Sequence, residues 1–497
     1  MSVPGRVLVA NRGEIALRII RACHEVGSEA VAVYSEADRL SPHVLEADEA
    51  YCIGPAASAQ SYLRADALVA VARSARCDAV HPGYGFLAER AHFARLVEDA
   101  GLIFIGPPPA AISAMGDKTE ARRRMIEAGV PVVPGIAEPL RDADAAHAAA
   151  AAFGYPVLLK AAAGGGGKGM RVVRGEAELA RAFDAARHEA ESAFGDGSIY
   201  LEKYLERPRH IEIQVFADMH GSVLHFGERD CSVQRRHQKL IEEAPSPAVS
   251  AELRERMGST AVAAARAVGY RNAGTIEFLF QDGEFYFLEM NTRIQVEHPV
   301  TELVMGIDLV QWQLRVAGGE ALPFRQSQIQ PSGHAIECRI TSEDPVNGFL
   351  PSTGRVTLLE VPGGPGVRWD GGIAEGVDVG LYYDPLLGKL IVHAPDRATA
   401  VDRMGRALAE LRIVGVETSA PFHRRAMAEG DFRAGNVTIR YLEEHEQLLV
   451  PELDAETLRQ AAVAAALLEE ESRRRHGAQR IAAEPAGRHG WRDRGWR

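Results

Sequence analysis

Cysteine is scarce in this sequence, and its few cysteines form no pattern. The 497 residues include five, which are Cys23, Cys52, Cys77, Cys231 and Cys338. No two of them have the close spacing of a zinc site, and an odd number argues against a disulfide framework. We therefore expect reduced thiols and a cytoplasmic location.

Long apolar segments and excess positive charge are also missing. No apolar run approaches the roughly 18 residues that a membrane span needs, and the segment RVLVA near the N-terminus is too short for a signal peptide. The net charge is −12, whereas nucleic-acid binding requires a basic surface. We therefore predict neither a membrane protein nor a nucleic-acid-binding protein.

The first 115 residues show a regular alternation of strand and helix patterns. Residues 6–10 are typical of a buried strand, and residues 11–27 are typical of a helix that ends at Gly27. The alternation continues through the apolar runs EAVAVYS and LIFIGP, which predicts a parallel α/β sheet. Farther along, the patterns predict helices over 118–129 and near 142–153, more strands, and a C-terminal helix with an Arg-rich tail that we expect to be disordered.

A glycine-rich run, GGGGKG at 164–169, fits neither of two common nucleotide-binding patterns. The dinucleotide pattern must open a helix, yet the strand-like MRVV follows, and the Walker pattern needs Ser or Thr where Gly169 stands. Two interpretations are left: a loop whose N–H groups lie over phosphates, or a flexible hairpin tip. Lys160 ends the apolar run just before the glycines and favours the phosphate loop, although a lysine can also extend from a strand end into solvent.

Two carboxylates stand inside the otherwise apolar strands of a predicted hairpin. A buried carboxylate is costly unless it is paired or bound to metal, and Glu289 shares a face with Asn291 by the strand period of two. A two-residue turn at Asp282-Gly283 would pair Glu277 with Leu288 and put the carboxylates on opposite faces. A three-residue turn would pair Glu277 with Glu289 and create a Mg²⁺ site. The metal hypothesis thus requires the longer turn, and the alternative is two solvent-facing glutamates on an edge hairpin.

Seven motifs follow one another along the chain, namely ANRGEIALRI, VHPGYGFLAE, MGDK, GGGGKGM, EKYLE, ERDCSVQRRHQKLIEEAP and FLEMNTRIQVEHPVTE. Together they resemble those of the biotin carboxylases, which have the ATP-grasp fold, and the resemblance runs from about residue 4 to 445. It implies α/β and α+β architecture in four parts: an N-terminal Rossmann-like domain over 1–117, an ATP-grasp domain over 118–330 with a mobile glycine-rich lid at about 131–203, a C-terminal biotin carboxylase domain over 331–446, and a helix and tail over 447–497.

The resemblance also implies the functional residues. ATP would be bound by Lys118, Lys160, Gly165, Gly166, Gly167, Glu202, Lys203, Leu205, His210, Gln234, His237, Glu277 and Glu289. Two Mg²⁺ or Mn²⁺ ions would be held by Glu277, Glu289 and Asn291. Bicarbonate would be bound by Lys239, Arg293, Gln295, Val296 and Glu297, and biotin by Tyr84 and Arg339. Of these, Lys239, Arg293, Glu297 and Arg339 would be catalytic.

The family's chemistry explains these residue types. ATP phosphorylates bicarbonate to carboxyphosphate, which releases CO₂ for attack by N1 of biotin. Glu297 would take the proton of bicarbonate as general base, Arg293 would clamp the planar anion, and Arg339 would stabilise the enolate-like charge on biotin. By contrast, we expect His298 to be structural and Cys231 to be a packed thiol.

The partners follow from what the family needs and this sequence lacks. No biotinylation site of the Ala-Met-Lys-Met type occurs, so biotin would arrive on a separate biotin carboxyl carrier protein, with carboxyltransferase subunits elsewhere and a homodimer as the expected assembly. The leading hypothesis is the first half-reaction of acetyl-CoA carboxylase in fatty acid synthesis. A propionyl-CoA, methylcrotonyl-CoA or pyruvate carboxylase is an alternative, because another subunit chooses the acceptor. A non-catalytic nucleotide-binding regulator would require a lost base or metal ligand, and all of these are present.

Overall fold

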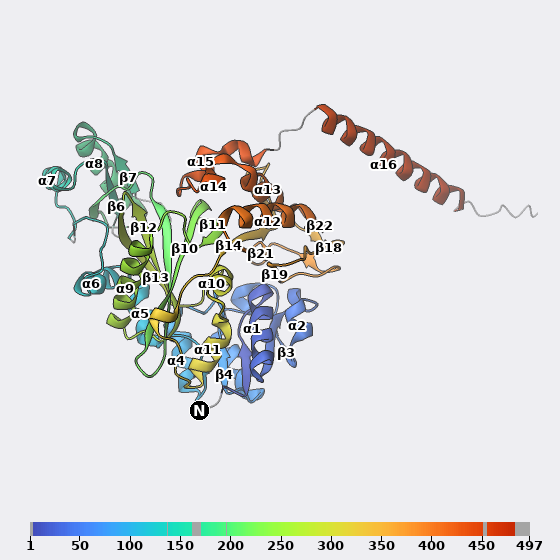
Figure 1. Cartoon of the computed structure of the whole chain (residues 1–497), viewed down its shortest axis with the longest axis horizontal. Coiled ribbons are helices and arrows are strands. Elements are labelled where there is room, and N and C mark those ends of the chain that lie inside the picture. The colour runs from blue at the N-terminus through green and yellow to red at the C-terminus, as the bar shows by residue number, and fades with distance from the viewer. Residues whose placement is uncertain (1–2, 137, 162–169, 195, 451–454, 483–497) are drawn as a thin grey trace, which may run out of the picture. The chain divides into compact units, whose positions relative to one another are not determined.

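The computed structural model describes residues 3–136, 138–161, 170–194, 196–450 and 455–482 (Figure 1). The chain divides into two compact units, Met1–Leu448 and Leu449–Arg497. The second unit contains one long helix, α16 (Ala455–Ala482). Among the described helices, none combines the length and the apolar character that crossing a bilayer would demand.

The N-terminal part is a five-stranded sheet in the order β3-β2-β1-β4-β5, and all its strand pairs are parallel. This confirms the predicted parallel α/β layer. Apolar residues fill it because every strand has helices on its faces, and Gly27 ends the first helix in the left-handed conformation at φ 83°. The elements are β1 (Arg6–Val9), α1 (Gly13–Val26), β2 (Glu29–Ser35), α2 (Pro42–Glu46), β3 (Glu49–Gly54), α3 (Ala65–Ser74), β4 (Ala79–His81), α4 (Ala91–Asp99), β5 (Ile103–Phe104) and α5 (Pro109–Gly116).

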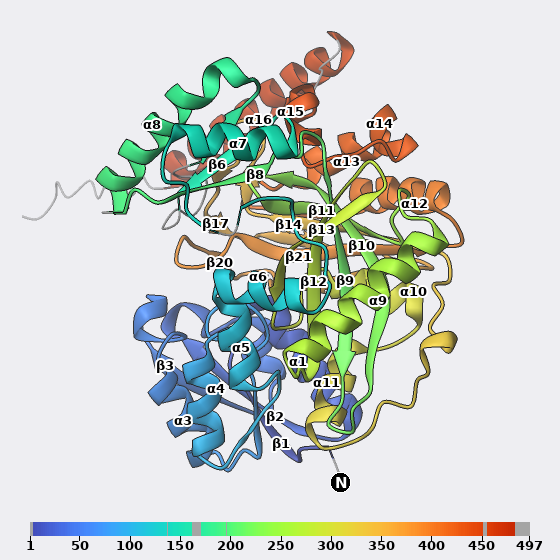
Figure 2. The ribbon, with the colours of Figure 1, turned by 90° about the vertical axis from the view of Figure 1, so that its left-hand side faces the viewer.

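An eight-stranded antiparallel sheet occupies the middle of the first unit, in the order β13-β12-β9-β10-β11-β14-β21-β19 (Figure 2). Helix α9 covers one face, where Ile213 and Phe278 join its core, and α10 packs on β11, β14 and β21. The elements before β14 are α6 (Lys118–Glu127), β9 (Arg209–Ala217), β10 (Val223–Arg235), β11 (Gln238–Ala244), α9 (Ala251–Ala267), β12 (Asn272–Gln281), β13 (Glu284–Asn291), α10 (His298–Met305) and α11 (Leu309–Ala317).

A small three-stranded sheet, β7-β6-β8, forms its own hydrophobic core with two helices. Its elements are α7 (Ala143–Phe153), β6 (Val157–Ala161), β7 (Met170–Val173), α8 (Glu176–Phe194) and β8 (Ile199–Lys203). The sequence analysis did not predict α8, although Leu179, Phe183, Ala186 and Ala190 recur at helical spacing and are buried. The glycine run lies outside the described residues, so neither interpretation of it is tested.

The C-terminal elements extend the large sheet, because β14 pairs with β11. Helix α12 packs on β14 and β21. The elements are β14 (His334–Thr341), β15 (Glu343–Asp344), β16 (Leu350–Pro351), β17 (Gly354–Arg355), β18 (Leu358–Glu360), β19 (Val367–Gly371), β20 (Asp378–Val379), β21 (Leu386–Ala394), α12 (Arg397–Glu410), β22 (Arg412–Val414), α13 (Ala420–Ala428), α14 (Gly430–Ala434) and α15 (Tyr441–Glu444). A single sheet therefore carries candidate residues from both the middle and the C-terminal segments.

Candidate active site

The predicted hairpin forms, but neither of the two predicted registers is the one observed. Its turn has two residues, Asp282-Gly283, and pairing is regular from the turn inward until a bulge at Leu288 adds one residue to β13. Beyond the bulge, Glu277 pairs directly with Glu289. The expectation that this pair needs a three-residue turn is therefore wrong, because a bulge shifts the register by one residue and re-aims the side chains that follow.

Lys239 of β11 lies at the centre of three carboxylates. Its Nζ donates to Glu212 Oε2 at 2.5 Å, to Glu297 Oε1 at 2.6 Å and to Glu277 Oε1 at 2.8 Å. These partners come from β9, from the segment before α10 and from β12, so the sheet itself assembles the group. The buried guanidinium of Arg229 adds a second cation, since its Nε donates to Glu212 Oε1 at 2.5 Å.

Glu297 is fully buried between two cations. Lys239 occupies one carboxylate oxygen, and Arg339 Nη2 donates to the other at 2.9 Å. The same guanidinium donates through Nε to Glu242 Oε1 at 2.6 Å. Arg339 on β14 and Lys239 on β11 thus approach one carboxylate from neighbouring strands, which holds Glu297 ionised and in a fixed orientation.

Arg293 ties the segment after β13 into this group. Its Nη1 donates to Gln295 Oε1 at 2.8 Å, its Nη2 to Asn291 Oδ1 at 3.0 Å, and its Nε to Glu89 Oε2 at 2.9 Å. Gln295 in turn donates to Glu277 Oε1 at 3.0 Å. The structure therefore brings Arg293, Gln295 and Glu297 together beside the hairpin, as a pocket for a small planar anion would require.

The donors expected for a metal ion lie together on the hairpin. Glu277 and Glu289 are cross-strand neighbours, and Asn291 Nδ2 donates to Glu277 Oε1 at 2.9 Å. Two carboxylates and an amide oxygen are hard donors of the kind that Mg²⁺ prefers, so the residues fit the ion. The amide oxygen of Asn291 accepts a hydrogen bond from Arg293, and binding an ion there would exchange that bond.

Burial and charge act in opposite directions on these carboxylates. Burial raises the pKa of Glu297, but Lys239 and Arg339 outweigh it and hold that pKa well below its ordinary value. Lys239 likewise outweighs burial at Glu277 and lowers its pKa. Burial prevails at Glu242 and raises its pKa to about 7 even though Arg339 lies against it. Glu297 and Glu277 are therefore ionised near neutral pH.

Four residues predicted to bind ATP belong to the small sheet or border it. Lys160 on β6 forms an ion pair with Glu202 on β8. Lys203 Nζ donates to the carbonyl oxygens of Gly154 and Tyr155, both at 3.0 Å, and the half-buried Leu205 follows β8. A phosphate group that approached Lys160 would have to exchange the ion pair with Glu202.

The other predicted ATP residues are spread over the large sheet and α6. His210 Nε2 lies 3.0 Å from Glu277 Oε2, and Gln234 is buried near the end of β10. His237 is exposed in the turn before β11 and has φ 67°. Lys118 is the first residue of α6. The Lys118 side chain and Gly165, Gly166 and Gly167 lie outside what the structure describes.

Tyr84 lies in the loop after β4, and its hydrogen bonds are with residues of the N-terminal part. Its hydroxyl donates to Glu14 of α1, and its carbonyl oxygen accepts from Asn11 Nδ2 at 2.7 Å.

Two other residues are the ones that the sequence analysis expected to be structural or packed. His298 is buried with Nδ1 2.8 Å from the Gln295 carbonyl oxygen, and burial raises the pKa of the Cys231 thiol well above its ordinary value.

The sequence analysis missed several charged residues that complete the group. Glu212 accepts hydrogen bonds from Lys239 and Arg229. Glu242 accepts one from Arg339, and Glu89 accepts one from Arg293. A usable signal existed for Glu212, which stands between Ile211 and Ile213 just as Glu277 stands between two apolar neighbours. Glu89 carries no such signal, because it lies in a loop far away in the sequence.

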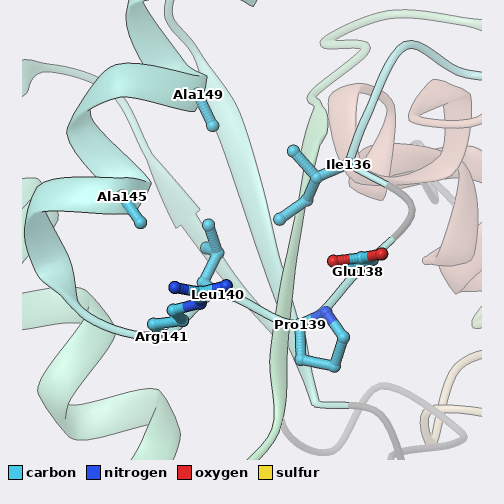
Figure 3. A pocket seen from close by; sticks show the side chains of 7 residues that line it. All are labelled: Ile136, Glu138, Pro139, Leu140, Arg141, Ala145 and Ala149. Carbon is cyan, nitrogen blue, oxygen red and sulfur yellow. The ribbon is translucent and has the colours of Figure 1, made fainter.

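A pocket near the small sheet is separate from the Lys239 group (Figure 3). It lies between the chain before α7 and that helix, and its lining is Ile136, Glu138, Pro139, Leu140, Arg141, Ala145 and Ala149. This described lining includes no predicted site residue. The pocket therefore adds nothing to the candidate active site.

Three family models match successive parts of the chain. They describe the biotin carboxylase N-terminal domain over residues 4–112, the ATP-binding domain of the carbamoyl-phosphate synthase L chain over 117–325, and the biotin carboxylase C-terminal domain over 337–444. Together they cover most of the first compact unit.

Full-length relatives agree with these matches. The chain is 54% identical over 442 residues to a pyruvate carboxylase subunit of Methanothermobacter thermautotrophicus, covering 89% of this chain and 90% of that one. It is 53% identical over 440 residues to the biotin carboxylase of Nostoc sp., covering 88% and 98%.

A solved structure is also similar. It is the biotin carboxylase domain dimer of the 2-oxoglutarate carboxylase of Hydrogenobacter thermophilus, in complex with MgADP, ADP and bicarbonate. The TM-score is 0.83 at 51% identity, and the match covers 91% of this chain and all of that one.

Proposed function

The chain belongs to the biotin carboxylase family of ATP-dependent ligases, and from this premise we propose how its residues carboxylate N1 of biotin through carboxyphosphate. The observation that carries the proposal is the buried carboxylate of Glu297 between Lys239 and Arg339. A carboxylate that can act as a base lies there within hydrogen-bond distance of a lysine and of an arginine that can donate to a developing oxyanion.

The first step is the activation of bicarbonate. Arg293, Gln295, Lys239 and the backbone of Val296 bind the anion. Glu297, held ionised by its two cations, takes the proton as bicarbonate attacks the γ-phosphate of ATP. Because Glu297 is fully buried, this proton transfer takes place away from bulk water.

ATP is placed by residues of both sheets. Lys160 and Lys118 contact the phosphates, Glu202, Lys203 and Leu205 hold the adenine, and His210, Gln234 and His237 lie along the nucleotide. Glu277, Glu289 and Asn291 would hold two Mg²⁺ ions, which would neutralise charge on the phosphates.

Biotin is placed by the C-terminal and N-terminal parts of the chain. Carboxyphosphate breaks down to CO₂ and phosphate, and when that phosphate takes the proton of N1, negative charge develops on the ureido oxygen. The guanidinium of Arg339 stabilises that charge with donors already fixed by Glu242 and Glu297. Tyr84 lines the same site from the loop after β4. The CO₂ released from carboxyphosphate then meets N1 without diffusing away.

We propose that the carboxylated biotin belongs to a separate carrier protein and that a carboxyltransferase completes the reaction. We also propose that the chain acts as a homodimer and that it works in the cytoplasm. A dimer is supported by the Hydrogenobacter domain, which crystallised as one. Acetyl-CoA is the first proposed acceptor. Pyruvate and 2-oxoglutarate are second candidates, because relatives at 54% and 51% identity are named for those acids.

The test is ATP hydrolysis by the purified chain with Mg²⁺ and bicarbonate, with and without free biotin. We expect phosphate release that depends on bicarbonate and rises when biotin is added, together with carboxybiotin trapped from labelled bicarbonate. The control omits bicarbonate. Phosphate release that ignores both bicarbonate and biotin would refute the proposed function.

A further inference from the structure

Lys389 is a fully buried lysine on β21 that none of the motifs of the sequence analysis includes. It pairs across the strands with Arg339 on β14. Helices α1 and α10 both pack against β21 (Figure 1). A charged amine in this position is costly unless it has partners of good geometry, so its partners show what the position requires.

Those partners come from two distant segments of the chain. Lys389 Nζ donates to the carbonyl oxygen of Val296 at 2.9 Å and lies 3.1 Å from Glu14 Oε1. Val296 is the residue between Gln295 and Glu297. Lys389 therefore fixes the backbone of the segment that carries the base, from the strand next to the one that carries Arg339.

Glu14 extends the connection to the biotin side. The same oxygen that faces Lys389 accepts the hydroxyl hydrogen of Tyr84. The backbone around Glu14 is tightly placed, because Gly372 at the end of β19 approaches so closely that an added Cβ would lie 2.5 Å from the Glu14 nitrogen. Lys389, Glu14 and Tyr84 thus form one chain of contacts from the bicarbonate segment to the biotin residue.

Two other acids lie close to Lys389. Asp370 on β19 pairs with Lys389 across the strands, but its carboxylate accepts its hydrogen bonds from Arg368. Glu337 is the second. Both its carboxyl oxygens are buried and have no hydrogen-bond partner among the described residues. Burial raises its pKa well above the ordinary value. The acid within hydrogen-bond distance of Lys389 is Glu14.

We propose that Lys389 is a positioning residue that holds the Val296 carbonyl and, through Glu14, the Tyr84 hydroxyl in one fixed relation, so that carboxyphosphate forms in line with biotin. This rests on the proposed function. Its consequence is efficiency of transfer: without Lys389, ATP is still bound, but CO₂ released at a displaced bicarbonate segment escapes before N1 of biotin captures it.

The test is the number of carboxybiotin molecules formed per ATP hydrolysed. For Lys389→Met, which keeps a long side chain without the charge, we expect this ratio to fall at least about tenfold while the KM for ATP changes by less than about threefold. A purely structural role would lower the amount of active protein without changing this ratio. The matched control is Arg397→Met, which removes the contacts of Arg397 with Glu243, at 2.7 and 3.1 Å, and none with Val296, Glu14 or Tyr84. Its ratio should equal that of the wild type.

A second variant covers the case in which Lys389→Met fails to fold. This variant is Glu14→Gln, which keeps the size of the side chain. It is combined with Tyr84→Phe in a double-mutant cycle. If the two residues act along one chain of contacts, their effects on the number of carboxybiotin molecules formed per ATP should be strongly non-additive. Additive effects, or a Lys389→Met ratio equal to wild type, would overturn the inference. A wild-type protein that forms no carboxybiotin at all would instead refute the proposed function.

Discussion

At the scale of single residues, four of the buried glutamates in the large sheet lie around the candidate site. They are Glu212, Glu242, Glu277 and Glu337, and all four are buried. Three of them receive hydrogen bonds from Lys239, Arg229 or Arg339. A charge in this environment is stable only with such partners, which makes the electrostatics of the group sensitive to each cation.

Glu297→Gln should abolish catalysis and spare nucleotide binding. The amide cannot accept the bicarbonate proton, so bicarbonate-dependent ATP hydrolysis should fall by about 10²-fold or more. The cations keep other carboxylates, since Lys239 retains Glu212 and Glu277 and Arg339 retains Glu242. ATP affinity measured by calorimetry should therefore stay within about threefold, less than 1 kcal/mol. A large loss of ATP affinity would assign Glu297 to the nucleotide site instead.

Lys239→Met should make the stability fall as the pH rises through the neutral range, where these carboxylates give the wild type no pH dependence. In the wild type, the lowered pKa values of Glu277 and Glu297 contribute stability that is present above the unfolded pKa, about 4.3, and is lost as the pH falls through the folded values. Without the lysine, burial raises both pKa values, the folded state binds more protons than the unfolded state, and stability falls as the pH rises.

Urea unfolding at pH 5.5 and 7.5 measures how the free energy of unfolding of the variant and of the wild type depends on pH. The variant should be about 3 kcal/mol less stable than wild type at pH 7.5, with a smaller difference at pH 5.5. An equal difference at both pH values would show that the lost stability comes from packing of the lysine side chain and not from its charge.

At the scale of elements, the bulge in β13 decides where Glu289 lies. Met290 and Phe287 are both buried in the core under α9 while Leu288 and Glu289 between them are exposed. In a regular strand, buried and exposed side chains alternate, so one exposed residue would separate two buried ones. Here two exposed residues lie between them, which is one more than a regular strand allows. The extra residue is Leu288, and it lets Glu289 face Glu277 across a two-residue turn.

Deleting Leu288 should therefore be tolerated, because it leaves Glu289 opposite Glu277 in a regular ladder and keeps Met290 in the core. Inserting one alanine after Leu288 should not be, since it displaces Glu289 from Glu277. Both variants are tested by the activation of ATP hydrolysis by Mg²⁺. For the deletion we expect an activation constant within about tenfold of the wild-type value, and for the insertion we expect loss of activation. Equal damage from both changes would mean that the bulge itself is required.

At the scale of the whole molecule, residues that act together come from segments far apart in sequence. The pairing of β11 with β14 joins the strand of Lys239 to the strand of Arg339. The long C-terminal helix belongs to the other compact unit, and its large apolar side chains, including Leu467 and Leu468, are exposed. The Nostoc relative is covered to 98% by an alignment of 440 residues, so it has little to match the tail.

Removal of residues 451–497 should leave biotin-stimulated ATP hydrolysis and the thermal unfolding midpoint unchanged, because the candidate site and the main cores lie in the first unit. Steady-state kinetics and calorimetry on the shortened chain check this. A drop in the unfolding midpoint would show that the tail packs on the first unit, and a drop in activity alone would give it a role in catalysis.

The sequence by itself determined the family and most local structure. Its strand, helix and turn patterns predicted the parallel N-terminal sheet, α6, α7 and the hairpin. Its ordered motifs named Lys239, Arg293, Glu297 and Arg339 through the family resemblance, since each motif is contiguous. It missed α8, whose apolar residues are partly alanines and give a weak periodic signal.

Only the tertiary structure decided the hairpin register and the partners of the site. The bulge at Leu288 depends on which residues the core under α9 accepts, and a pattern of alternation cannot count an extra residue. Glu89 and Lys389 lie about 200 and 100 residues from the residues they hold, Arg293 and Val296. Contacts of that kind arise when strands and loops meet in space, because hydrogen bonding and charge pairing depend on distance through space and not along the chain.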